Sequence, residues 1–243
     1  MTITKIGNAQ GTAARVAGWS GLLTFAIVVF GNYVLLNPLI VPSNVAATAQ
    51  NVVAHQTQLR ITAVCFLTYS LGVVVLLTAL YVILKPVNHG LALVGALFRL
   101  VFALLWLLSP LNLLAMLRLV SNANYLQAFE PDRLQALARL HLGATFDDYY
   151  IGLPFFGLAA TVCARLWLKS NYIPRGLSIF GVIASAWCVL CAVVYLIFPD
   201  FNKIVNDYIF DSPMALFELA VSFWLLFRGL KPVASVQAQT GVV

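Results

Sequence analysis

The sequence predicts an all-α fold, a polytopic transmembrane bundle of six membrane-spanning helices with a short amphipathic interfacial helix between helices three and four. Three observations support this prediction. Of the 243 residues, 62% are hydrophobic and 9% are charged, and the mean hydropathy is +0.93, which is far outside the range of a soluble globular domain. The apolar residues form long continuous runs. The charged residues fall mostly between these runs, at positions that suit the ends of membrane helices.

Six apolar runs are each long enough to cross a bilayer, because about 20 helical residues span its hydrocarbon core. No short apolar core with a small-residue cleavage pattern precedes the first run, so we expect that helix to stay in the protein. The third run contains Arg99, Ser109, Pro110 and Asn112, an unusually polar set, and we expect it inside the bundle. The expected spans are 17–41, 59–84, 90–119, 149–168, 176–198 and 211–231.

The predicted interfacial helix lies within 121–145, where the hydropathy drops between the third and fourth runs. Pro131 opens this segment, and proline suits the first turn of a helix. Leu134, Leu137 and His141 then recur at helical spacing. The pattern predicts a short amphipathic helix on the membrane surface.

Charged residues separate between the two faces that six spans define. One face carries every acid except Glu218, namely Glu130, Asp132, Asp147, Asp148, Asp200, Asp207 and Asp211. The other face has no acid and carries Lys5, Arg15, Lys85, Arg165, Lys169, Arg175, Arg228 and Lys231. Because cytoplasmic ends collect Lys and Arg, we expect a multi-pass protein of the cell inner (plasma) membrane with both termini in the cytoplasm. Residues 1–231 are then a single transmembrane domain, and residues 232–243 a disordered cytoplasmic tail.

Composition also limits the partners. The formal net charge is +6, but the basic residues are scattered singly and mostly at helix ends, which argues against nucleic acid. The four cysteines fall inside apolar runs and are interpreted as small core residues. The chain has no phosphate-binding loop, dinucleotide-binding turn or zinc-protease helix, and we predict no cofactor. Membrane lipids and a small amphiphilic ligand are the expected partners.

Glu218 is the single carboxylate well inside the last apolar run. A charge near the bilayer centre costs on the order of a few kcal/mol, so this side chain should face a partner or a wet cavity. Asn112 lies at a similar depth, and Arg60 reaches inward from the same side of the membrane. Arg99 starts from the opposite side, so we favour Arg60 as the partner. Ser222, one turn along from Glu218, extends the polar face inward.

Five further polar residues are candidates on the extracytoplasmic side, namely Thr48, Asn51, His141, Asp147 and Asp148. The histidine and the two acids after it offer nitrogen and oxygen atoms of the kind that bind divalent metals. Their spacing fits no established zinc motif, and a site needs three or four converging ligands. We therefore predict no metal site.

Several stretches together resemble a known family. Read in order, NVAATAQN followed by Arg60, LYVILKPVNHGLALVGALFRL, FDDYYIGLPFFGL, YIPRGLSIFG, the exit Phe198-Pro199-Asp200 and FELAVSFWLLFRGLK are similar to the bacterial membrane-protein family catalogued as domain of unknown function 4386. The resemblance extends from the first helix to the last and implies no activity. Two positions depart from it, with Asn44 in place of an expected acid and Ser178 in place of an expected glycine.

These observations favour one function and leave two others open. The favoured hypothesis is a protein that binds a small amphiphilic or lipid-like ligand in a polar cavity open to the extracytoplasmic side. The second is a membrane-embedded enzyme acting on a lipid or isoprenoid, with Glu218 or an outer Asp as general acid and Arg60 or Arg99 holding an anionic head group. The third is a proton-coupled transporter in which Glu218 changes protonation. Glu218 also has a purely structural interpretation, as a buried tie between helices.

The charge distribution makes the topology testable by cysteine labelling. A cysteine introduced at Gln127 or Asn206 should react with a membrane-impermeant maleimide in intact cells, and one at Asn88 should not, because the first two positions lie on the acidic face. Labelling of the unmodified protein measures the background signal from its own four cysteines. Labelling at Asn88 alone would reverse the topology.

Overall fold

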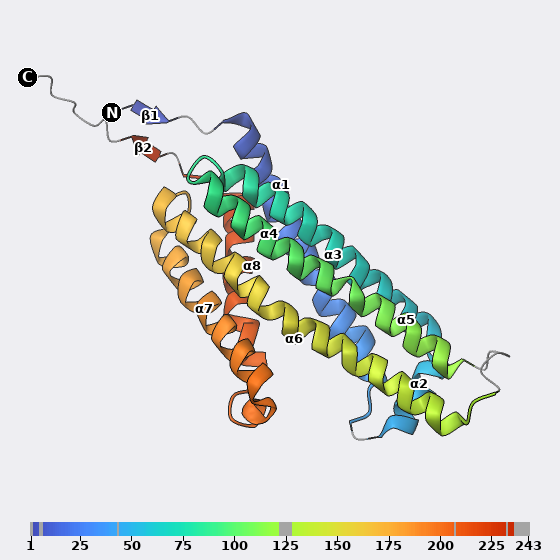
Figure 1. The fold of residues 1–243 in the computed structure, drawn as a ribbon. Helices are drawn as coiled ribbons and strands as arrows, with labels where there is room; N and C mark the ends of the chain where they lie inside the picture. Colours follow the sequence, from blue (N-terminus) through green and yellow to red (C-terminus); the bar gives the residue numbers. More distant parts are fainter. Residues whose placement is uncertain are drawn as a thin grey trace, which may run out of the picture.

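Long helices running alternately in opposite directions make up most of the chain (Figure 1). The computed structural model describes residues 2–4, 7–42, 44–121, 128–206, 208–231 and 233–235. The helices are α1 (Asn8–Val29), α2 (Val45–Ala54), α3 (Gln56–Leu84), α4 (His89–Trp106), α5 (Leu108–Val120), α6 (Pro131–Ser170), α7 (Arg175–Ile197) and α8 (Tyr208–Phe227). A π-helix, Phe30–Leu36, and short 3-10 turns at Asn37–Leu39 and Pro199–Lys203 extend α1 and α7.

Six helical segments among the described residues are long and apolar enough to cross a membrane. They are Asn8–Leu39, Gln56–Leu84, His89–Val120, Arg133–Ser170, Arg175–Ile197 and Tyr208–Phe227. This confirms the predicted all-helical fold with six spans, and the chain is a multi-pass membrane protein.

Local sequence explains where several helices begin, bend and end. The side chains of Asn44 and Asn88 accept hydrogen bonds from Ala47 N and Leu91 N, both at 2.9 Å, and so cap the starts of α2 and α4. Pro110 lacks the N–H that would bond to the carbonyl of Trp106, and the third span is divided there into α4 and α5. Gly229 follows α8 with φ +66, a left-handed conformation that glycine adopts without strain.

The predicted interfacial helix is present, but its separation from the fourth span is wrong. Residues from Pro131 to Ser170 form one continuous helix of 40 residues, about 60 Å long. Ala138 and Leu142 in this segment are buried in the main core, whereas Leu137 and Leu140 are exposed. One side of this segment therefore packs inside the bundle, where Asn112 of α5 contacts His141 and Asp148, and the other side is exposed.

The six spans close into a ring. Each span packs against the one before and the one after it, and α8 returns to pack against α1. Direct contacts across the ring, such as those between α3 and α6, are few. The ring therefore has an interior that helices from different parts of the chain share.

Glycines allow neighbouring helices in the ring to approach closely. A Cβ at Gly18 of α1 would lie 2.9 Å from both Leu226 Cβ and the carbonyl oxygen of Ser222 on α8. A Cβ at Gly157 of α6 would meet the carbonyl oxygen of Ser185 on α7 at 3.0 Å. Small residues are typical of such contacts because apolar lipid gives helices no hydrophobic reason to associate, so close packing has to hold them together.

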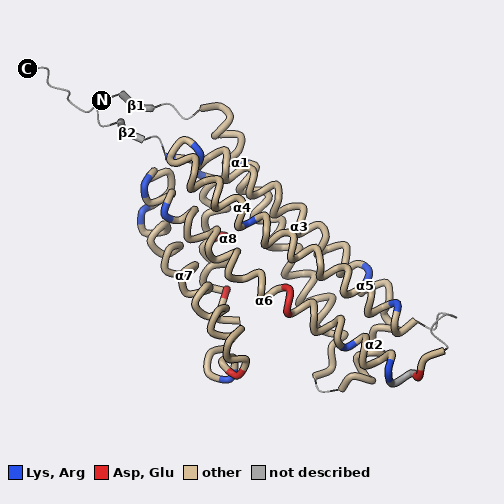
Figure 2. The backbone as a smooth tube through the Cα atoms, viewed as in Figure 1, with Lys and Arg blue, Asp and Glu red and all other residues tan. Residues whose placement is uncertain are grey.

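The first and last described segments of the chain lie at one end of the bundle. The strands β1 (Thr2–Thr4) and β2 (Val233–Ser235) pair antiparallel there, with Thr2 opposite Ser235. Figure 2 shows Lys and Arg at this end and no Asp or Glu, which agrees with the charge separation used to predict the topology. Several positions used for topology or the predicted tail lie outside the described residues, namely Lys5, Gln127, Asp207, 232 and 236–243.

The contact between α1 and α8 predicts opposite effects for two glycine substitutions in the same helix. Gly18→Ala should lower the melting temperature in detergent, because overpacking of a tight contact costs about 1–3 kcal/mol. Gly11→Ala is the control, since a Cβ there meets nothing within 4 Å and alanine favours the helix by up to about 1 kcal/mol. Equal melting temperatures for the two variants would contradict this packing.

Candidate functional site

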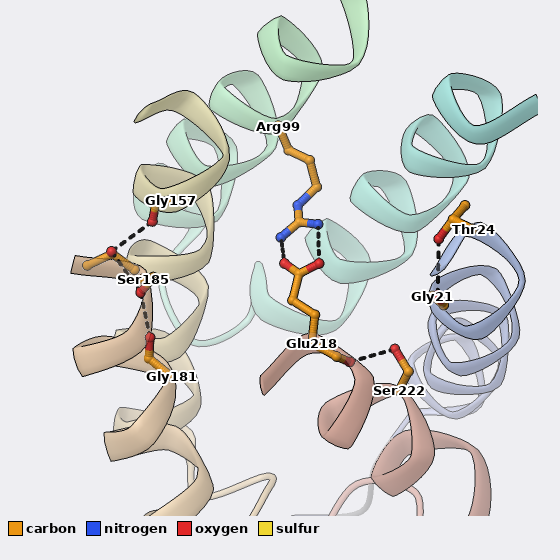
Figure 3. A network of polar contacts seen from close by, with 9 residues as sticks. Gly21, Thr24, Arg99, Gly157, Gly181, Ser185, Glu218 and Ser222 are labelled. Carbon is orange, nitrogen blue, oxygen red and sulfur yellow. Dashed lines mark hydrogen bonds and ion pairs between the residues drawn. The ribbon is translucent and has the colours of Figure 1, made fainter. Parts of the chain in front are cut away.

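An ion pair spans the interior of the ring. Arg99 of α4 and Glu218 of α8 face each other head-on (Figure 3). The guanidinium donates from Nη1 to Oε2 at 3.1 Å and from Nη2 to Oε1, a bidentate arrangement. Only 3% of the Arg99 side chain and 23% of the Glu218 side chain are exposed. Because α4 and α8 are not neighbours in the ring, this pair connects two spans whose backbones do not pack together.

Aromatic and polar groups surround the pair. The guanidinium lies over the ring of Phe156, 5.2 Å from its centroid, and Phe156 is stacked on Phe102. This contact adds a cation–π attraction on the face of the guanidinium. Ser222 donates a 2.8 Å hydrogen bond to the backbone carbonyl of Glu218 rather than to its carboxylate. The carboxylate of Glu218 is therefore held chiefly by Arg99.

The sequence-based preference for Arg60 as the partner of Glu218 is wrong. Arg60 is exposed, whereas Leu59, Ala63 and Phe66 on the same helix are buried. Side chains at these spacings share one face of a helix, and Arg60 projects from another face. The sequence places Arg60 at a depth from which its side chain could reach the level of Glu218. The rotation of α3 around its own axis, however, directs this side chain away from the interior of the ring.

A cavity of about 480 Å³ adjoins the ion pair. Five spans line it, with residues from α1, α3, α4, α6 and α8. Arg99, Glu218 and Ser222 lie at its inner end, near the middle of the bundle. Tyr33 and Tyr208 lie at its outer end, where both are exposed and their ring centroids are 6.1 Å apart. The cavity thus extends from mid-bundle toward the end opposite the chain termini.

Asn112 does not join the ion pair as the sequence analysis expected. Its Nδ2 donates to Asp148 Oδ2 at 2.8 Å, and its Oδ1 lies 3.2 Å from Nδ1 of His141. These contacts tie α5 to α6 in a separate polar cluster.

The remaining outer candidates have local structural contacts. Thr48 is buried and hydrogen-bonds to the backbone of Val41 and Asn44. Asn51 donates to the carbonyl of Leu39 at 3.3 Å, so both side chains fasten α2 to the turn after the first span. Asp147 is exposed. The described residues contain no group of three or more His, Cys, Asp or Glu side chains placed to hold a metal ion.

Sequence reasoning missed a second carboxylate in the cavity. The hydroxyl of Tyr149 on α6 donates to Asp211 Oδ2 on α8 at 2.6 Å, and both residues line the cavity. From the sequence, Asp211 is predicted only as one of the acids of the outer face. Its position seven residues before Glu218 carried the missing signal, because residues seven apart lie on the same face of a helix.

Comparisons with known proteins identify the family. A family model described as Domain of unknown function (DUF4386) matches residues 16–229, which confirms the resemblance noted in the sequence. An uncharacterized protein of Archaeoglobus fulgidus is 26% identical over 154 residues, covering 63% of this chain and 74% of the relative. No solved structure matches the chain.

The ion pair predicts a specific pattern of stability in purified protein. Glu218→Gln should lower the melting temperature in detergent, because breaking a buried pair leaves a buried charge and costs about 3–5 kcal/mol. Adding Arg99→Gln to that variant should restore part of the loss. Arg60→Gln serves as the control and should melt like the parent, since Arg60 is exposed. Wild-type melting of Glu218→Gln would contradict the structural importance of the pair.

Proposed function

Because the chain belongs to the family described as Domain of unknown function (DUF4386), whose description assigns no activity, we propose its function from the cavity itself. The protein binds a small amphiphilic or lipid-like ligand in the cavity whose inner end is formed by Arg99 and Glu218. The single observation that carries this proposal is a cavity of about 480 Å³ among membrane-spanning helices, with apolar walls and a few convergent polar groups.

The size and lining of the cavity suit a small organic molecule. Pockets for such ligands commonly have volumes of roughly 300–1,000 Å³ and are lined mainly by apolar and aromatic side chains. Phe66, Val73, Leu76 and Phe102 supply apolar surface here, while Arg99 and Glu218 at the inner end supply polar groups. A ligand with both an apolar and a polar part matches this distribution.

Trp106 provides a further reason to expect a polar atom in the ligand. This tryptophan lines the cavity with 6% of its surface exposed, and its Nε1 has no hydrogen-bond partner among the described residues. An unsatisfied buried donor costs about 1–3 kcal/mol. A ligand oxygen that accepts a hydrogen bond from Nε1 would remove this cost.

The wall between α1 and α8 suits a ligand that arrives from the lipid. These helices touch closely at Gly18, whereas further out they contribute Phe25, Val29 and Leu216 to the cavity lining. Leu216 is 58% exposed although it lines the cavity. An apolar side chain that is exposed at membrane depth supports entry through the gap between α1 and α8.

The distribution of charged residues also supports an orientation of the protein in the membrane. Lys85, Lys169, Arg175 and Arg228 lie near helix ends on the side of the chain termini, and no described acid accompanies them. We therefore place both termini in the cytoplasm and the protein in the cell inner (plasma) membrane. In this orientation the outer end of the cavity faces the extracytoplasmic side.

The proposal is tested by asking what copurifies with the protein. Wild-type protein extracted in a mild detergent should retain a small lipophilic molecule, detected by mass spectrometry after solvent extraction. Ala215→Trp should reduce the amount retained, because Ala215 lines the cavity and the larger side chain fills it. Ala220→Trp is the matched control on the same helix, since Ala220 is exposed and does not line the cavity.

Three outcomes would change the proposed function. Equal amounts of the same molecules in all three proteins would mean that they bind the outer surface, and would contradict the proposal. Chemical conversion of the retained molecule on incubation with membrane extract would favour the lipid-modifying enzyme instead. Uptake into proteoliposomes driven by a pH gradient would favour the proton-coupled transporter.

A further inference from the structure

The proposed function leaves the charge of the ligand open, and the cavity itself gives an answer. We infer that the cavity selects an organic cation, whose ammonium or quaternary nitrogen lies beside Asp211 and the aromatic rings near it. This inference rests on the proposed function and narrows its ligand class. It differs from the anionic head group that the arginines in the sequence suggested.

The argument begins with the formal charges in the cavity. Among the described lining residues, three are charged, namely Arg99, Asp211 and Glu218. Arg99 and Glu218 neutralise each other through two hydrogen bonds. An anionic ligand could bond to the two terminal nitrogens of Arg99 only by displacing Glu218 and leaving that carboxylate uncompensated, which is unfavourable in a poorly hydrated interior. Asp211 contributes the remaining formal charge, which is negative.

Two contacts of Asp211 stabilise its ionised form and offset part of the cost of burying the carboxylate. Asp211 lies in the first turn of α8, where the partial positive charge at the start of a helix stabilises a carboxylate. The hydroxyl of Tyr149 donates to it at 2.6 Å, the short distance typical of a hydrogen bond to a charged acceptor. Neither contact brings a full positive charge, so a cationic ligand would supply the missing counter-charge.

Aromatic rings lie at the same level of the cavity. The ring of Tyr149 is 6.0 Å from that of Trp106 in an edge-on arrangement, and Trp106 is 4.6 Å from Tyr69. Tyr33 and Tyr208 add a second pair at the outer end. Aromatic faces attract cations, and cages of aromatic rings with a nearby carboxylate recognise quaternary ammonium groups. These five aromatic residues and Asp211, which has no cationic partner among the described residues, therefore point to the same ligand chemistry.

The inference is tested with two water-soluble probes that share a benzyl group and differ in charge. Benzyltrimethylammonium is the cation and phenylmethanesulfonate is the anion, and binding to the purified protein in a neutral detergent is measured by titration calorimetry. Wild-type protein should bind the cation saturably and at least about tenfold more tightly than the anion, a difference of about 1.4 kcal/mol.

Two matched variants assign the effect to Asp211. Asp211→Asn keeps an acceptor for the Tyr149 hydroxyl but removes the charge, and it should weaken binding of the cation about tenfold or more. Asp200→Asn removes an exposed acid outside the cavity and should leave the affinity unchanged. Melting temperatures of both variants report whether they remain folded, and a destabilised Asp211→Asn is replaced by Asp211→Ser.

The other outcomes overturn the inference and separate it from the proposed function. Tighter binding of the sulfonate, or equal binding of both probes, would show a ligand cavity without selectivity for cations. Unchanged cation affinity in the Asp211 variants would place the cation elsewhere. Saturation by neither probe would also reject a cationic ligand, while the copurification experiment with Ala215→Trp would still decide whether the cavity binds a ligand.

Discussion

The pairing of Arg99 with Glu218 is the interaction on which the interior of this bundle depends. Two charges at membrane depth are costly individually, and each is tolerated here because the other is its direct partner. The pair need not be more stabilising than an apolar contact of the same size. Its structural effect is specificity, because it fixes how α4 and α8 face each other across a ring in which their backbones do not pack together.

The glycine contacts explain why the same bundle is tight at one level and hollow at another. Gly18 and Gly21 bring α1 against α8 near Ser222, beside the inner end of the cavity. Further out, the larger side chains of Phe25 and Val29 on α1 and of Leu216 on α8 line the cavity. Alternation of small and large residues along two helices thus positions the cavity on one side of the ion pair.

The sequence predicted the fold well because composition and run length are sufficient to place membrane-spanning helices. It also predicted that Glu218 faces the interior, since lipid excludes an unpaired carboxylate. It did not predict the partner of Glu218, because the depth of an arginine along its helix does not say in which direction around the helix axis the side chain points. Arg60 and Arg99 differ in rotation, and only the packed structure shows that Arg60 projects outward and Arg99 inward.

The fourth span shows a second limit of sequence reasoning. The drop in hydropathy before Tyr149 predicts the end of one helix and the start of another. Between Leu142 and the apolar run, however, the weakest helix former is a single glycine, Gly143, and the helix continues through it. The polar residues His141 and Asp148 are accommodated because Asn112 on α5 bonds to both. Such compensation depends on a residue about 30 positions away, which hydropathy along the chain does not reveal.

The two carboxylates of α8 show how position along one helix face assigns different roles. Glu218 lies deep, where little solvent can reach it, and its charge is balanced by a protein cation. Asp211 lies two turns nearer the outer end, where the start of α8 and the Tyr149 hydroxyl stabilise the carboxylate without cancelling its charge. The inner carboxylate therefore serves to join helices. The described residues give the outer one no ion pair, and a cationic ligand would supply it in the inference drawn above.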